Sequence, residues 1–179
     1  MPPQFAYATS KESILTRPLK GKTTIGWFFG FKLHIVINDK GEILDFVITQ
    51  ANIDDREPLK NKRFHKKVFG KIFADKGYIS KDLFDNLFVD GIHLITKIKK
   101  NMKNSLMLMS DKIYLRKRAI IENVNDQLKN ICQIEHTRHR SFENFIGNMV
   151  SGLIAYNFLP KKPSLNLEIV DIQNMKMIA

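Results

Sequence analysis

An alternation of apolar residues between Trp27 and Gln50 is the feature of this chain that most constrains its fold. Along the first half of this stretch every second residue is large and apolar: Phe29, Phe31, Leu33, Ile35 and Ile37. A period of two is typical of a β-strand, because successive side chains point to opposite faces of a sheet. Residues 38–41, Asn-Asp-Lys-Gly, supply a turn, and residues 43–49 supply a return strand. We therefore predict a β-hairpin over residues 27–50.

Downstream of the hairpin, short strands and helices alternate. Asp54 and Asp55 precede a basic run, and we interpret this pair as the cap of a short helix rather than as a metal site. The apolar run at residues 71–74 predicts a buried strand that delivers Asp75 at its carboxyl end, where α/β folds place active-site groups. A helix from Ser80 to residue 89 and a strand at residues 93–97 follow. The order β-β-α-β-α-β indicates an α/β fold.

Residues 111–130 read as a single helix, capped by Ser110 or Asp111 and carrying one apolar stripe. Arg118, Glu122 and Lys129 fall near one face of it, at spacings of four and seven residues. An exposed ion pair is one interpretation of this line. The other is a metal-binding glutamate flanked by cations that hold phosphates. A last helix, residues 142–159, is apolar on most sides and should pack across the sheet.

The net charge of +11 indicates an acidic partner, and nucleic acid first among these. A second basic cluster supports this, because residues 136–140 interleave histidine and arginine, and we interpret it as a phosphate-facing patch: His136, Arg138, His139 and Arg140. Cys132 is the only cysteine, which excludes a disulfide framework and a cysteine-based zinc site. No segment has the apolar length of a membrane span, so a cytoplasmic, nucleoid-associated location fits.

The first 25 residues show the weakest pattern of helix or strand periodicity in the chain. Prolines and glycines interrupt them, no apolar period runs for long, and Glu12 is their only acid. We expect an arm without folded elements over residues 1–25, and a loosely held tail over residues 164–179.

Three stretches together resemble one family: GWFFGFKLHIVINDKGEI in the hairpin, ADKGY around Asp75, and LRKRAIIENVNDQLKN followed by HTRHRS. They are similar to the catalytic domain of bacterial insertion-sequence transposases of the DDE type. The resemblance covers residues 26–163. It implies a ribonuclease H-like mixed sheet with flanking helices, and Mg²⁺ or Mn²⁺ as cofactor, with two ions in an intact member. It also implies DNA as partner, both transposon ends and target, with a homodimer on DNA as one option.

The resemblance assigns the second and third metal-binding acids of the family to Asp75 and Glu122. It implies DNA-backbone contacts for Lys76, Arg118, Lys129 and the cluster at residues 136–140. The first acid should lie on a strand before the hairpin. Only Glu12 is acidic there, and nothing around it reads as a strand, so the first catalytic aspartate and the first strand of the sheet are expected to be missing.

This departure predicts the C-terminal part of a transposase gene, cut or frameshifted near residue 20. The function implied is DNA transposition, by metal-dependent DNA cleavage and strand transfer at insertion-sequence ends. A catalytically inactive DNA-binding remnant and a stand-alone ribonuclease H-like nuclease are the alternatives. We expect Asp75 and Glu122 to approach within metal-bridging reach, DNA binding to depend steeply on salt, and strand transfer by this chain alone to be weak or absent.

Overall fold

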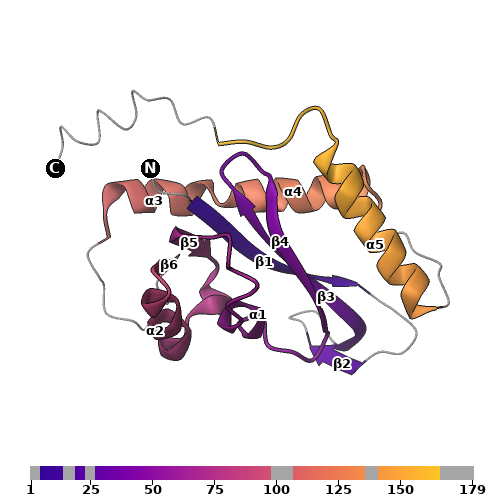
Figure 1. Ribbon diagram of the computed structural model, residues 1–179, viewed down its shortest axis with the longest axis horizontal. Coiled ribbons are helices and arrows are strands. Elements are labelled where there is room, and N and C mark those ends of the chain that lie inside the picture. Colours follow the sequence, from indigo (N-terminus) through magenta and orange to yellow (C-terminus); the bar gives the residue numbers. More distant parts are fainter. Residues whose placement is uncertain (1–4, 14–18, 23–26, 98–106, 136–140, 166–179) are drawn as a thin grey trace.

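A computed structural model describes residues 5–13, 19–22, 27–97, 107–135 and 141–165 of the chain. Strands and helices alternate after the hairpin, as predicted (Figure 1). The elements are β1 (Phe5–Ser13), β2 (Leu19–Lys22), β3 (Trp27–Asn38), β4 (Ile43–Gln50), α1 (Glu57–Lys60), β5 (Gly70–Ala74), a 3-10 turn (Lys76–Tyr78), α2 (Lys81–Val89), β6 (Ile92–Thr96), α3 (Met109–Lys117), α4 (Ala119–Asn130) and α5 (Phe142–Asn157).

The strands form one mixed sheet. From β4 the order runs β4, β3, β1, β5, β6, and β2 pairs with the first residues of β3. Pairing among β4, β3 and β1 is antiparallel, whereas β1, β5 and β6 are parallel. Parallel strands need crossover connections, and the segments that contain α1 and α2 provide one between β4 and β5 and one between β5 and β6. The predicted α/β sheet with flanking helices is confirmed.

The first strand is present, which corrects two predictions. β1 pairs with β3 from Ala6 to Ser13 and with β5 from Phe5 to Tyr7, so it lies in the middle of the sheet. The prediction of an arm without folded elements over residues 1–25 is therefore wrong, as is the interpretation that the sheet lacks its first strand. The sequence of β1 has no sustained apolar alternation that would predict a strand. Pairing with β3 on one side and β5 on the other holds it in the sheet.

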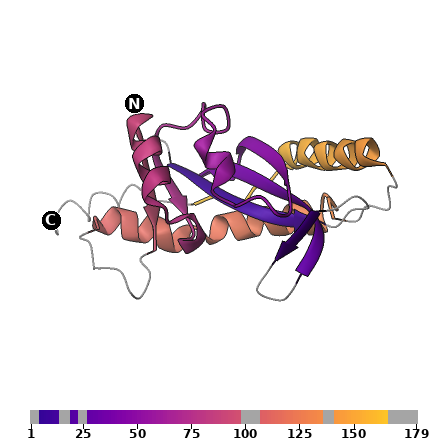
Figure 2. The same ribbon diagram turned by 90° about the horizontal axis from the view of Figure 1, so that it is seen from below.

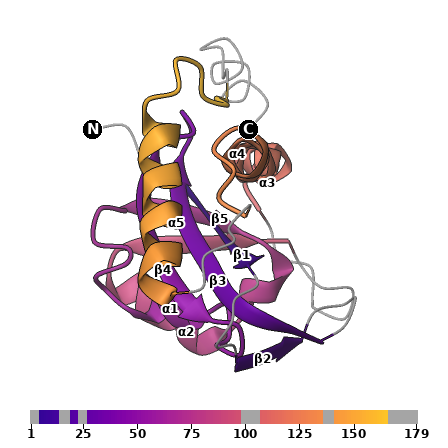
Figure 3. The same cartoon turned by 90° about the vertical axis from the view of Figure 1, so that its right-hand side faces the viewer.

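The two faces of the sheet are covered by different helices. One face, here called the α4 face, packs against α4 and α5 through Leu33, Ile35, Ile37 and Phe73. The opposite α2 face packs against α1 and α2 through Val36, Ile72, Ala74 and Leu94. Figure 3 looks along α3 and α4 and shows α5 as a separate helix in front of the sheet. Each strand residue can thus be assigned to a face by its alternation.

The β3–β4 hairpin is confirmed, and its turn is fixed by α5. Gly41 has a φ of +71°, which favours glycine, and a Cβ there would lie 2.2 Å from the backbone oxygen of Pro163. The buried hydroxyl of Tyr156 donates a hydrogen bond of 2.6 Å to the Gly41 carbonyl. Burial raises the pKa of Tyr156 to about 12, so this hydroxyl keeps its proton over the whole physiological range.

The predicted helix over residues 111–130 is two helices that meet at Arg118. The residue has helical φ but a ψ of only −12°, so α3 ends and α4 begins there. Figures 1 and 2 show the two helices running nearly in one line across the sheet. The predicted cap is also wrong, because α3 begins after Leu108 without a side-chain cap, and Asp111 is buried in an ion pair with Lys71.

Of two further predicted helix caps, one is confirmed and one is wrong. Ser80 caps α2 by accepting from the backbone N–H of Leu83, as predicted. Asp54 and Asp55 do not cap α1, whose first turn has no side-chain cap. No helix within the described ranges is long and apolar enough to cross a membrane. The predicted basic cluster at residues 136–140 lies outside those ranges.

Candidate active site

Asp75 stands at the carboxyl end of β5, as the sequence predicts. Its backbone is still extended, so the alternation that puts Phe73 on the α4 face puts Asp75 there too. The Asp75 carboxylate caps the following 3-10 turn by accepting from the Lys76 backbone N–H at 2.7 Å. Its side chain remains 59% exposed, which leaves it open to a ligand from solvent.

Arg118 reaches Asp75 from the junction of α3 and α4. The distance from its Nη1 to the Asp75 Oδ1 is 2.8 Å, and the Arg118 side chain is only 23% exposed. The guanidinium is therefore fixed over the end of β5 rather than extended into solvent. The spacing of Arg118 and Glu122 in the sequence favoured an ion pair between these two residues. In the structure Arg118 forms its ion pair with Asp75 instead.

Glu122 follows Arg118 by one helical turn, about 6 Å along the axis of α4. It is exposed, and within the described ranges its carboxylate has no ion pair or hydrogen bond. Arg118 contacts Asp75 and immediately precedes α4, whose first turn carries Glu122. Whether the two carboxylates come within reach of one ion stays a prediction.

Lys129 lies further along α4, and its Nζ forms an ion pair with Glu135 at 3.0 Å. Both side chains keep substantial exposure, 48% and 25%, so the pair is weak and a phosphate can compete for the lysine. Lys76 is exposed beside Asp75. His136, Arg138, His139 and Arg140 fall outside the described ranges, so their predicted role stays a prediction.

Lys97 is a site residue that the sequence reasoning missed. Ala74 of β5 pairs with Thr96 of β6 in parallel register, so Lys97 is level with Asp75 one strand away. Its positive charge acts on the aspartate. The signal was available in the sequence, because two parallel strands that end in Asp75 and Lys97 bring these residues to the same edge.

The electrostatics of Asp75 favour its charged form. Partial burial opposes ionisation of the carboxyl, but the Lys76 backbone N–H and the Arg118 guanidinium outweigh it, with help from Lys97. The pKa of Asp75 therefore lies below its usual value. The carboxylate is negative at neutral pH, and protein cations already balance much of its charge.

The site does not fit a pair of divalent ions. Within the described ranges, no three histidine, cysteine, aspartate or glutamate side chains gather into a metal-binding group. One Asp75 oxygen is occupied by Arg118 and the Lys76 amide. The only acid of β1 is Glu12, which pairs with Lys32 in register. Leu33 and Ile35 of β3 belong to the α4 face. Because successive strand residues alternate between faces, Lys32 and the position of Glu12 that pairs with it belong to the α2 face.

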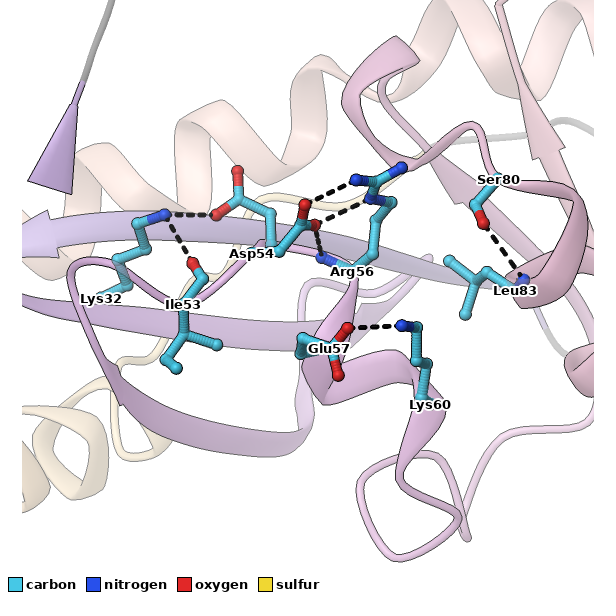
Figure 4. Close-up of polar contacts among 9 residues, drawn as sticks. Lys32, Ile53, Asp54, Arg56, Glu57, Lys60, Ser80 and Leu83 are labelled. Carbon is cyan, nitrogen blue, oxygen red and sulfur yellow. Dashed lines mark hydrogen bonds and ion pairs between the residues drawn. The ribbon is translucent and has the colours of Figure 1, made fainter.

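A second polar cluster lies on the α2 face (Figure 4). The Lys32 Nζ donates to the Ile53 carbonyl and to Asp55, both at 2.9 Å. The Arg56 guanidinium and backbone N–H bind Asp54, and this hydrogen bonding holds the pKa of Asp54 well below its usual range. Asp54 and Asp55 are therefore paired with Arg56 and Lys32, and neither completes the site of Asp75.

A family model and two solved structures are similar to this chain. The family model described as "Transposase DDE domain" matches residues 8–142. Among curated proteins, no relative matches the chain in sequence. A structure of the piggyBac transposase synaptic complex with hairpin DNA is similar over 88% of this chain, with a TM-score of 0.62 and 10% identity. The simian T-cell lymphotropic virus intasome, in complex with the PP2A regulatory subunit B56 gamma, is similar over 86%, with a TM-score of 0.50 and 13% identity.

At these identities the two structures show the fold alone, and it is the ribonuclease H-like fold that the resemblance implied. This chain spans 46% of the piggyBac chain and 48% of the intasome chain.

Proposed function

We propose, since this chain belongs to the Transposase DDE domain family, that it acts in DNA transposition by holding DNA against the carboxylates of Asp75 and Glu122. Cleavage and strand transfer at insertion-sequence ends are the reaction of a complete site. The observation that carries the proposal is the Asp75–Arg118 contact, because it brings the end of β5 and the start of α4 together. We place the protein in the cytoplasm, on the nucleoid.

The site's own residues would bind the substrate through charge. Arg118 and Lys97 stand beside Asp75, and Lys76 is exposed next to them. A DNA phosphate that approaches this edge meets three cations, while the net charge of +11 draws DNA to the molecule over a longer range. Arg118 can bind a phosphate with the edge of its guanidinium that Asp75 does not use. Lys129, Arg138 and Arg140 would extend the path for the backbone.

The metal chemistry of the family is Lewis-acid activation by divalent ions that carboxylates hold in place. Asp75 and Glu122 are the residues of this chain that would contribute oxygen ligands of the kind Mg²⁺ or Mn²⁺ prefers. Because no third carboxylate joins this site among the residues that the structure describes, we propose that cleavage and strand transfer by this chain alone are weak or absent. A missing preorganised group of this kind costs on the order of 100-fold in rate or more.

Salt dependence of DNA binding tests the proposal. Fluorescence anisotropy with a labelled duplex should show log K falling linearly with log salt, by about 0.9 for each phosphate contacted. Replacing Arg138 and Arg140 together by glutamine should reduce both affinity and slope. Replacing Arg56 and Arg63 by glutamine removes the same charge from the segment around α1 and should change the slope less. The proposal would be contradicted if the two double variants changed the salt slope equally, or if the affinity for DNA did not depend on salt concentration.

A cleavage assay separates a site with little or no activity from an active nuclease. DNA that carries an insertion-sequence end is incubated with the protein and Mg²⁺ or Mn²⁺, beside an Asp75→Ala variant. Background cleavage, equal in both, is expected. In the described part of the chain no metal-binding group with a third carboxylate forms at Asp75, and this observation favours a catalytically inactive DNA-binding domain as second candidate. Robust cleavage that Asp75→Ala abolishes would mean that another acid completes the site, and would favour the nuclease reading.

A further inference from the structure

The register of β1 identifies the residue that stands beside Asp75. β1 and β5 run parallel and pair through Tyr7 and Phe73. Two residues further along both strands, position 9 is level with position 75. The pairing of β1 with β3 shows that β1 stays regular through this position, because Thr9 pairs with Ile35 and the register holds without a shift from Ala6 to Ser13. Thr9 is thus the residue of β1 nearest in register to Asp75.

Position 9 also belongs to the same face of the sheet as Asp75. Its partner Ile35 packs on the α4 face, as does Phe73, which alternates with Asp75 along β5. Neighbouring strands lie about 4.8 Å apart. The helix α4, which follows Arg118 and carries Glu122, lies against β1 on this face. Position 9 therefore adjoins Asp75 beneath the start of α4.

The other polar positions of β1 do not share this place. Ser10 pairs with His34 and Glu12 pairs with Lys32, and both partners alternate with the residues of the α4 face. Positions 10 and 12 therefore belong to the α2 face. Position 12 also lies about 10 Å further along the strand than position 9. The one acidic position of β1, position 12, thus belongs to the α2 face. Position 9, on the α4 face with Asp75, holds a neutral threonine.

We propose that Thr9 stands where a metal-binding carboxylate is needed, and that Arg118 and Lys97 balance the charge of Asp75 in place of a metal ion. The proposal rests on the proposed function. A threonine hydroxyl is neutral at physiological pH and is a weak ligand for hard cations, which prefer carboxylate oxygen. Asp75 then keeps its protein cations, at 2.8 Å in the case of Arg118. The missing ligand is a single side chain on an intact backbone.

A direct consequence is that one substitution should create a divalent-ion site. Thr9→Asp adds a second carboxylate on the α4 face, one strand from Asp75, and two adjacent carboxylates can both supply oxygen ligands to one divalent ion. Ser10→Asp is the matched control, because it adds the same charge one residue away on the α2 face. Combining Thr9→Asp with Asp75→Asn tests whether the two positions act together.

Mn²⁺ binding, measured by calorimetry and by the loss of the free-ion electron paramagnetic resonance signal, is the readout. We expect Thr9→Asp to bind Mn²⁺ at least tenfold more tightly than the unmodified chain. Ser10→Asp and the double variant with Asp75→Asn should match the unmodified chain. An equal gain for Ser10→Asp, or no gain for Thr9→Asp, would overturn the assignment of position 9.

Thermal unfolding with and without Mn²⁺ keeps the test informative if Thr9→Asp folds poorly. Two carboxylates side by side repel each other in the absence of metal, and an ion that binds only the folded state raises its stability. Thr9→Asp should therefore regain its melting temperature in millimolar Mn²⁺, whereas Ser10→Asp should not. A Thr9→Asp chain that stays unfolded in Mn²⁺ would count against the proposal.

DNA binding distinguishes failure of this inference from failure of the proposed function. The unmodified chain with salt-dependent DNA binding, but no Mn²⁺ gain for Thr9→Asp, would overturn only the role of position 9. A Mn²⁺ gain without DNA binding would confirm the place of the ligand and remove the function on which it rests.

Discussion

At the scale of single residues, His34 is a buried group whose protonation is coupled to folding. It is buried on the α2 face, where its Nε2 lies 2.7 Å from the Thr49 hydroxyl and its Nδ1 has no hydrogen-bond partner among the described residues. Burial lowers the pKa of His34 from 6.5 to about 4, Asp55 opposes this shift and Lys32 adds to it. The imidazole is therefore neutral in the folded protein at pH values where it is charged in the unfolded chain.

The free energy of unfolding should consequently fall as pH is lowered from about 6.5 to 4. In this window the unfolded chain binds more protons at His34 than the folded chain, so acid favours unfolding. The full effect is about 3 kcal/mol, at roughly 1.4 kcal/mol per pKa unit. Urea unfolding of the unmodified chain and of His34→Gln at pH 7 and pH 4 measures it. The advantage of histidine over glutamine should shrink by this amount, and a constant difference would contradict the prediction.

At the scale of elements, α3 is tied to the sheet by a buried ion pair. The Lys71 Nζ lies 2.6 Å from the Asp111 Oδ1, and the Asp111 side chain is only 6% exposed. Tyr114, one turn further along α3, packs its ring against Phe73. Both contacts join α3 to β5, the strand that ends at Asp75. They hold the α3–α4 junction, and with it Arg118, over the site.

Removing one partner of this pair should destabilise the protein more than removing both. Asp111→Ala leaves the Lys71 ammonium without its partner, and we expect a loss of about 3 kcal/mol. The double variant Lys71→Met with Asp111→Leu should lose much less, because apolar packing replaces the pair. Lys60→Ala breaks an exposed pair with Glu57 and should cost under about 1 kcal/mol. Denaturant unfolding of these three variants and the unmodified chain checks this, and a double variant that loses as much stability as Asp111→Ala would contradict it.

Predictability from the sequence also differs between elements. The β3–β4 hairpin and the strand before Asp75 were predicted because alternation and a glycine turn are local signals. β1 was missed because its sequence, FAYATSKES, has no sustained apolar alternation, and two neighbouring strands hold it in place. The break at Arg118 was missed because no glycine or proline marks it. Asp75 and Glu122 were assigned by resemblance, but Thr9 needs the register of three strands.

At the scale of the whole molecule, β1 joins an antiparallel half of the sheet to a parallel half. Removing it would leave β3 and β5 with unpaired edges. We expect a chain with residues 5–13 replaced by a glycine–serine linker to lose cooperative unfolding. A synthetic peptide of residues 5–13 added in excess should restore it. Circular dichroism during thermal melting measures both, and a cooperative transition in the linker chain without peptide would show that β1 is dispensable.

The position of β1 also sets the order in which the sheet can assemble during synthesis. Its antiparallel partner β3 leaves the ribosome about 25 residues after it, but its parallel partner β5 follows only after more than sixty residues. Local pairings form before distant ones, because closing a longer loop costs more entropy. The nascent chain should therefore hold β1 on the hairpin with one edge open until β5 arrives. During that interval the edge that will adjoin Asp75 is a surface for chaperones to shield.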